Sequence, residues 1–289
     1  MTLPEQLPGI RTVAERYQGI ILDLWGVVHD GQTAFPHSAA TFERLKAAGI
    51  KVVLLTNAPR RSHTLASQLQ GLGIDRSLYD DIVSSGEAVH TSLVGGSDLG
   101  FADLGRRCHH MGPDRDISVF EGLGLDFTGP EDADFIVNTG PADFNETLAD
   151  YIPALETGAR RGIPMICANP DRWIVRQGRK IMCAGVFADH YLELGGNVFW
   201  RGKPDPAVYT LCLDRLGVPP EAVAVVGDGL ETDVRGAANA GLDCVWVTGG
   251  LHAEELAAGY GIPADPARAA ALAATEGLAP KSIVAGFIW

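Results

Sequence analysis

Long apolar segments are missing from this sequence. No window approaches about 18 uninterrupted apolar residues, the length that a membrane-spanning helix needs. The first residues, MTLPEQLPGIRTVAERY, carry acidic side chains and lack the apolar stretch of a signal peptide. We therefore expect no membrane span and no signal peptide, and we expect a cytoplasmic protein.

Cysteine pairs at metal or redox spacing are also missing. The chain has no CxxC pair and no histidine at metal-ligand spacing from a cysteine. The five cysteines are Cys108, Cys167, Cys183, Cys212 and Cys244. We expect them to be buried and reduced.

Basic residues are scarce, because 23 Lys and Arg stand against 36 Asp and Glu and give a net charge of -13. Nucleic acids and anionic membranes are bound by clustered basic side chains. Here the basic pairs Arg60-Arg61, Arg106-Arg107 and Arg160-Arg161 are isolated. We expect a small molecule as the partner, with no nucleic acid and no membrane.

The pattern that is present alternates strands with helices along 289 residues, 46% of them hydrophobic. Strand-like Ile20–Leu24, a helix over 38–48 and the apolar run Ile50–Leu55 form a βαβ unit. A smaller α/β unit follows and closes with a hairpin over 173–183, and the chain rejoins the first pattern at Val198–Trp200. We expect a Rossmann-like parallel-sheet core domain (1–86 and 196–289) and a smaller α/β cap domain (87–195).

Four polar residues follow predicted strands: Asp23, Thr56, Lys203 and Asp228. Each one alone has an ordinary structural explanation as a turn or helix cap. In a parallel sheet, however, all four would converge on one crevice, where Asp233 would join them. Three aspartates in one crevice repel one another unless a cation lies among them, and oxygen ligands suit Mg²⁺. This set favours phosphoryl transfer to Asp23, with Lys203 and Thr56 holding the phosphate oxygens.

The segments DLWGV, LLTN, GKPDP and VVGDGLETD, in this order, resemble the four motifs of the haloacid dehalogenase (HAD) superfamily. The insert between the second and third motifs resembles the C2-type cap of subfamily IIA, the NagD-like phosphatases. The resemblance implies that Asp23 is both nucleophile and Mg²⁺ ligand, that Asp228 and the main-chain carbonyl of Trp25 are further ligands, and that Asp233 accepts from metal-bound water. It also suggests a homodimer.

Trp25 departs from that resemblance, because the family's phosphatases have a second aspartate two residues after the nucleophile. That aspartate protonates the leaving group and then activates water, and Trp25 can do neither. Two neighbours, His29 and Asp30, are candidate substitutes, although the pair is more readily explained as shaping the loop. The superfamily's true dehalogenases have a tyrosine at this position, but their cap follows the first motif directly, which counts against dehalogenation here.

We interpret the chain as a Mg²⁺-dependent hydrolase, a phosphatase of small phosphorylated metabolites of the nucleotide or sugar phosphate class. Asn57 at the end of its strand and Asn169 and Asp171 of the cap are expected to contact the substrate. The alternative is a weakly active or inactive protein that binds Mg²⁺ and a phosphorylated ligand through the same residues. The absence of an acid at Trp25 keeps that alternative open.

Overall fold

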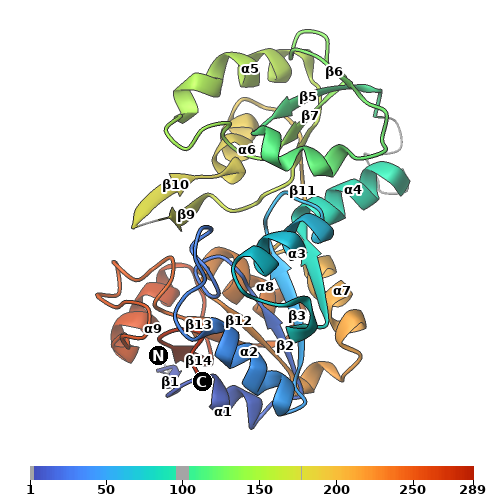
Figure 1. Cartoon of the computed structure of the whole chain (residues 1–289). Coiled ribbons are helices and arrows are strands. Elements are labelled where there is room, and N and C mark those ends of the chain that lie inside the picture. The colour runs from blue at the N-terminus through green and yellow to red at the C-terminus, as the bar shows by residue number, and fades with distance from the viewer. Residues whose placement is uncertain (1–2, 96–103, 177) are drawn as a thin grey trace.

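Two separate β-sheets organise the protein in a computed structural model (Figure 1), which describes residues 3–95, 104–176 and 178–289. The larger sheet is entirely parallel. Its strands, in spatial order, are β1 (Glu5–Gln6), β14 (Ser282–Val284), β13 (Asp243–Val247), β12 (Val223–Gly227), β2 (Gly19–Leu22), β3 (Lys51–Thr56) and β4 (Asp81–Ser84). The predicted Rossmann-like core is confirmed.

Both faces of this sheet are covered by helices, so its strands are apolar at successive positions. Ile20 and Leu22 of β2 pack into one apolar cluster, whereas Ile21 packs into another on the opposite face. The first cluster includes residues of α1 (Ile10–Ala14), α2 (Ser38–Ala47) and α3 (Ser62–Gly71). The second includes residues of α7 (Pro206–Leu216), α8 (Arg235–Ala240) and α9 (Pro266–Thr275).

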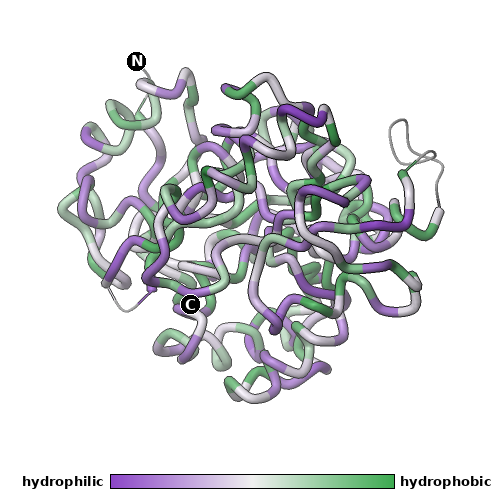
Figure 2. The backbone as a smooth tube through the Cα atoms, turned by 90° about the horizontal axis from the view of Figure 1, so that it is seen from above, coloured by the Kyte–Doolittle hydropathy of each residue, from purple (hydrophilic) through white to green (hydrophobic). Residues whose placement is uncertain are grey.

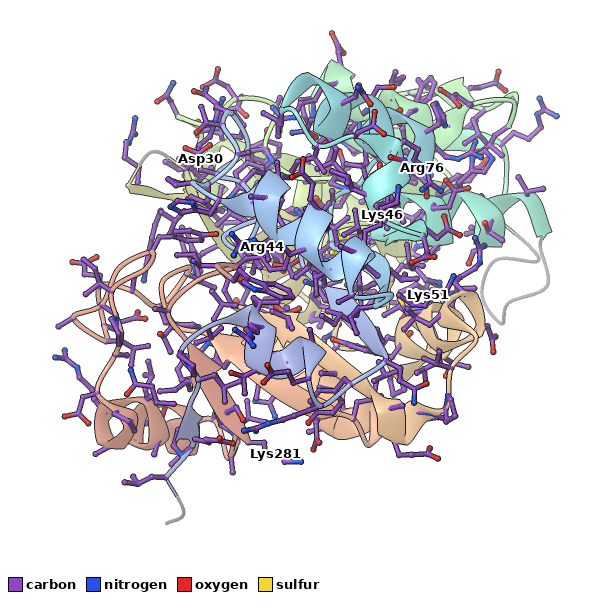
Figure 3. All side chains as sticks on the ribbon, turned by 60° about the horizontal axis from the view of Figure 1, so that its bottom comes forward. Asp30, Arg44, Lys46, Lys51, Arg76 and Lys281 are labelled. Carbon is purple, nitrogen blue, oxygen red and sulfur yellow. The ribbon has the colours of Figure 1, made fainter. Side chains whose placement is uncertain are left out.

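Helix α2 illustrates this packing, because apolar side chains lie on its buried face and charged side chains on its exposed face. Thr41, Phe42 and Leu45 are buried, whereas Arg44 and Lys46 are exposed (Figure 3). Hydrophobic and hydrophilic residues alternate along the described part of the backbone (Figure 2). No helix in the described ranges is long and apolar enough to cross a membrane.

The smaller sheet belongs to the cap and is also parallel. In spatial order it contains β11 (Val198–Trp200), β8 (Met165–Cys167), β7 (Phe135–Asn138), β5 (Arg107–Met111) and β6 (Asp126–Phe127). Its apolar clusters include residues of α5 (Leu148–Arg161) and α6 (Ala184–Glu193) on one side, and of α4 (Ser85–Gly95) with the 3₁₀ segment Asp114–Phe120 on the other.

One expectation about an element is corrected. We predicted that Val198–Trp200 returns to the core, but β11 pairs with β8 at the edge of the cap sheet. Helix α5 begins at Leu148, after a capping box that Thr147 and Asp150 form. After α9, the chain adds β14 to the core sheet.

A short antiparallel hairpin extends from the cap toward the core (Figure 1). It consists of β9 (Trp173–Arg176) and β10 (Arg179–Met182). The hairpin was expected from the sequence, and Gln177 of its predicted turn lies outside the described residues. Its position brings cap residues to the carboxyl end of the core strands.

Candidate active site

The site forms where the strand order of the core sheet reverses. The chain runs from β2 to β3 and β4 on one side, and then continues at β12 on the other side of β2. Such switch points open a crevice at the carboxyl ends of the strands. Asp23 directly follows β2 and Asp228 directly follows β12, which places both carboxylates in this crevice.

Three aspartates come together there as predicted. Asp23, Asp228 and Asp233 each contribute one oxygen to a group in which all three atoms lie within 4.8 Å of one another. All three are buried, with exposed fractions of 6%, 7% and 2% respectively. The segment that carries Asp233 is a π-helical turn over Leu230–Val234, and α8 begins directly after it at Arg235.

Burial dominates the electrostatics of these carboxyl groups. It raises the pKa of Asp23 to about 7, opposed by Lys203 and reinforced by Asp233. Burial, then repulsion from Asp23 and Asp233, raises the pKa of Asp228 well above its ordinary value. A cation among these oxygens would relieve both effects, and an all-oxygen donor set suits a hard divalent ion. The residues present therefore fit a divalent metal.

Lys203 is the positive charge of the crevice. Its Nζ donates to Asp23 Oδ1 at 2.6 Å and to Asp233 Oδ1 at 2.8 Å, and only 2% of the residue is exposed. Burial alone would lower the pKa of this ammonium group, but the surrounding carboxylates Asp23, Asp233 and Asp171 raise it well above its ordinary value. Lys203 is therefore a permanent cation beside the nucleophile.

Thr56 and Asn57 occupy the end of β3 as expected. Thr56 lines the crevice, and its Oγ1 accepts from the Ala58 N–H at 3.2 Å. Asn57 holds other parts of the site in place: its Oδ1 accepts from the Lys203 N–H at 2.8 Å, and its Nδ2 donates to Asp171 Oδ1 at 2.8 Å. This geometry makes Asn57 a positioning residue for Lys203 and Asp171.

Trp25 connects the nucleophile loop to the cap. Its indole Nε1–H donates to the main-chain carbonyl of Val175 in β9 at 2.8 Å. The ring lies so close to Gly31 that a β-carbon there would overlap it, and Gly31 has a φ of +89°. The sequence indicated a missing acid at this position but not the contact with the hairpin, because Val175 is 150 residues away.

His29 and Asp30 accept hydrogen bonds from the backbone of their own loop. His29 is 4% exposed, and its Nδ1 accepts from the Gly31 N–H at 3.0 Å. Burial, reinforced by Arg60, lowers the pKa of His29 to about 4. Asp30 Oδ1 accepts from the N–H groups of Gln32 and Thr33 at 2.9 and 2.8 Å. These contacts favour the loop-shaping explanation of the pair.

The cap loop after β8 reaches the crevice. Asp171 lines it together with Trp173 and Val175 of the hairpin. Burial raises the pKa of the Asp171 carboxyl above its ordinary value, opposed by Lys203. Asn169 Oδ1 accepts from the Asp171 N–H at 3.1 Å, so Asn169 sets the turn that presents Asp171.

Seven further residues line the crevice and were not predicted as site residues: Gly26, Trp173, Ile174, Val175, Gly229, Thr232 and Leu251. Two of them contact Asp228. The Leu251 N–H donates to Asp228 Oδ2 at 2.7 Å, and Gly26, with a φ of +80°, leaves room for that carboxylate where a β-carbon would overlap it. Gly26 lies three residues after the nucleophile, where a glycine in the sequence indicates a sharp turn. Leu251 acts through its backbone and left no side-chain signal.

Comparisons with known proteins agree with this geometry. A family model described as haloacid dehalogenase-like hydrolase matches residues 20–126, and a second, described as HAD-hydrolase-like, matches residues 200–274. The crystal structure of a haloacid dehalogenase-like hydrolase from Brucella suis 1330 is 32% identical, covers 99% of this chain and 100% of its own, and superposes with a TM-score of 0.82.

Two curated relatives extend the match. Ribonucleotide monophosphatase NagD of Escherichia coli K12 is 26% identical over 238 residues, covering 81% of this chain and 88% of its own. An acid sugar phosphatase of Staphylococcus aureus USA300 is 24% identical over 245 residues, covering 83% and 90%. The chain belongs to the haloacid dehalogenase-like hydrolase family. Within that family it is NagD-like, with a C2-type cap inserted between the second and third motifs.

Proposed function

We propose that this protein is a Mg²⁺-dependent phosphatase of small phosphorylated metabolites, of the nucleotide or sugar phosphate class, which acts through an aspartyl-phosphate at Asp23. The observation that carries the proposal is the contact of Lys203 Nζ with Asp23 Oδ1 at 2.6 Å beside Asp228 and Asp233. This arrangement pairs a nucleophilic carboxylate with a fixed cation for phosphate oxygens. The names of the curated relatives support the reaction class.

In the proposed reaction, an oxygen of Asp23 attacks phosphorus while the bond from phosphorus to the ester oxygen breaks. Lys203 and the Thr56 hydroxyl hold the phosphate oxygens. Asp23, Asp228, Asp233 and the main-chain carbonyl of Trp25 would hold Mg²⁺, which when bound offsets the phosphate charge. Water then attacks the aspartyl-phosphate, which releases phosphate and restores Asp23.

Proton transfer to the leaving oxygen is the step that Trp25 leaves without its usual acid. General acid-base catalysis typically contributes ~100- to 10,000-fold to the rate. Asp171 is the cap carboxyl that lines the crevice, and burial raises its pKa above the ordinary value. We assign it the proton transfer to the leaving group, in addition to the predicted contact with substrate.

Trp25 also supports the second candidate function, a protein that binds Mg²⁺ and a phosphorylated ligand with little or no turnover. In this alternative Lys203 and the aspartates bind the ligand, and the Trp25 contact with Val175 signals cap closure. The homodimer and the cytoplasmic location stay predictions.

The test is Mg²⁺-dependent phosphate release from p-nitrophenyl phosphate, acetyl phosphate, nucleoside monophosphates and sugar phosphates. The phosphatase proposal expects turnover by the wild type and a loss of at least ~100-fold in Asp23→Asn, because the nucleophile is removed. Turnover by Trp25→Asp alone would show an intact but disarmed site and favour the binding protein. Mg²⁺-dependent trapping by beryllium fluoride, absent in Asp23→Asn, would establish the nucleophile independently of turnover.

A further inference from the structure

A second cavity, of about 170 Å³, adjoins the crevice between core and cap. The linings of the two cavities share Trp25, Thr56, Asp171 and Ile174, so a ligand whose phosphate lies beside Asp23 would extend its other end into this space. A cavity of about 150 Å³ accommodates benzene. The space therefore has room for a leaving group of at least roughly that size.

Three arginines line this second cavity. Arg60 comes from the loop after β3, Arg115 from the 3₁₀ segment of the cap, and Arg176 from β9. The guanidinium groups of Arg115 and Arg176 lie over the ring of Phe144, with their carbons 4.6 and 4.2 Å from its centroid. This aromatic contact positions two cations without neutralising them.

Two carboxylates, Asp116 and Asp171, line the same cavity as the three arginines. Asp116 is 1% exposed, and its Oδ1 lies 3.6 Å from Arg60 Nε and 3.7 Å from Arg115 Nε. Arg60 Nε and Asp116 Oδ1 are both buried without a hydrogen-bond partner. Among the residues that the structure describes, no hydrogen bond engages the guanidinium groups of Arg60, Arg115 or Arg176. The cavity thus holds excess positive charge and unused donors beside the nucleophile.

We propose that this cavity is a binding site for a second anionic group, a carboxylate or a phosphate, on the leaving-group side of the substrate. Unused guanidinium donors in a partly buried site recognise oxyanions by paired, charge-assisted hydrogen bonds. The inference rests on the proposed phosphatase function and narrows its substrates to phosphate monoesters that carry a second anionic group. Asp116 pairs with Arg60 and Arg115 beside this site.

The test compares ligands that differ only in this anionic group. Phosphoglycolate is paired with hydroxyethyl phosphate, and phosphoglycerate with glycerol phosphate, so that a carboxylate replaces a hydroxymethyl group at two chain lengths. Calorimetry with Mg²⁺ and the full-length Asp23→Asn protein measures binding without turnover. We expect the anionic member of at least one pair to bind roughly tenfold or more tightly, as hydrogen bonds to charged groups typically provide.

Variants locate the effect. Arg115→Gln and Arg176→Gln should each reduce the ratio of the two affinities within a ligand pair toward one. Arg179→Gln is the control and should retain the wild-type ratio, because Arg179 is an exposed residue of β10 outside the cavity lining. Equal binding within both pairs, no binding of either pair, or a preference that survives both variants would overturn the proposal. Because this readout needs no catalysis, it is separate from a failure of the wild type to release phosphate.

Discussion

At the scale of single residues, Gly26 provides a sharp test of the metal site. Its φ is +80°, and a β-carbon would overlap the Asp228 carboxylate; Gly49 has a similar φ of +75° but no atom within 4 Å of an added β-carbon. Both substitutions to alanine should therefore cost about 1–2 kcal/mol of stability through backbone strain. Only Gly26→Ala should also lose Mg²⁺ binding, measured by calorimetry. Equal Mg²⁺ affinity in the two variants would contradict the proposed ligand role of Asp228.

Asp171 is the second residue with a specific expectation. If its carboxyl protonates the leaving group, Asp171→Asn should reduce kcat/KM for alkyl phosphates by ~100-fold or more, the usual contribution of a general acid. The loss on p-nitrophenyl phosphate should be smaller, because that leaving group needs no proton. Asp189→Asn is the control, since Asp189 pairs with Arg172 outside the crevice. The same loss on both esters would leave Asp171 a binding role only.

At the scale of elements, the hairpin of β9 and β10 contacts the core through the hydrogen bond from Trp25 to Val175 and through the exposed ion pair of Lys180 with Glu255. Trp25→Phe retains an aromatic ring but removes the donor, which typically costs ~0.5–1.5 kcal/mol. The hairpin should then open roughly two- to tenfold more often, and trypsin should cut faster at Arg176, Arg179 and Lys180. Trp289→Phe, far along the chain from this contact, is the control. Unchanged cleavage in Trp25→Phe would show that the hairpin is held by other contacts.

The elements also show what the sequence could predict. Strand β3 lies where the apolar run Ile50–Leu55 predicted it, because a continuous apolar run identifies a strand that is buried on both faces of a parallel sheet. The sheet to which a short strand belongs leaves no such pattern. Val198–Trp200 is equally apolar whether it pairs in the core or in the cap, and only its pairing with Met165–Cys167 decides the matter.

At the scale of the whole molecule, the buried aspartates link stability, pH and metal. The pKa of Asp23 is raised to about 7 from an ordinary value near 3.8, and that of Asp228 is also raised, mainly by burial. At a pH between the unfolded and the folded pKa of Asp23, about 3.8 and about 7, the folded protein binds more protons than the unfolded chain. The metal-free protein should therefore lose stability as pH rises from about 4 to 7.

Mg²⁺ should reverse that loss, because ligands bind metal in their ionised form. The increase in Tm on adding Mg²⁺ should therefore be larger at about pH 8 than at about pH 6. Asp228→Asn removes the repulsion among the carboxylates. Its metal-free Tm at about pH 8 should therefore rise, by roughly 2–4 °C for each kcal/mol gained in the free energy of unfolding. The increase in Tm on adding Mg²⁺ should disappear in this variant. Asp214→Asn, at an exposed position, should behave as the wild type. A Tm increase that does not depend on pH would contradict this account.

The site as a whole was predictable where side chains follow strands and unpredictable where core meets cap. Asp23, Thr56 and Asp228 were found from their order along the chain, since the parallel strands of the core sheet end at one edge. Lys203 was also expected in the crevice, but it follows β11 of the cap sheet and reaches the crevice from the segment that returns to the core. The cavity of Arg60, Arg115 and Arg176 brings together three segments that are about 55 and 61 residues apart along the chain, and no local sequence pattern predicts that they meet. The pair Arg60-Arg61 could be seen in the sequence, but nothing near it in the sequence indicated that Arg115 and Arg176 would lie beside Arg60.

The most direct test of the central claim is the search for phosphate on Asp23 during turnover. Wild-type protein is mixed with acetyl phosphate and Mg²⁺, quenched in acid and digested, and the peptide containing Asp23 is weighed by mass spectrometry. Because Trp25 supplies no base for the second step, the aspartyl-phosphate should accumulate in the wild type, decline in Trp25→Asp and be absent from Asp23→Asn. Phosphate release without any modified Asp23 peptide, or modification of another residue, would contradict the proposed mechanism.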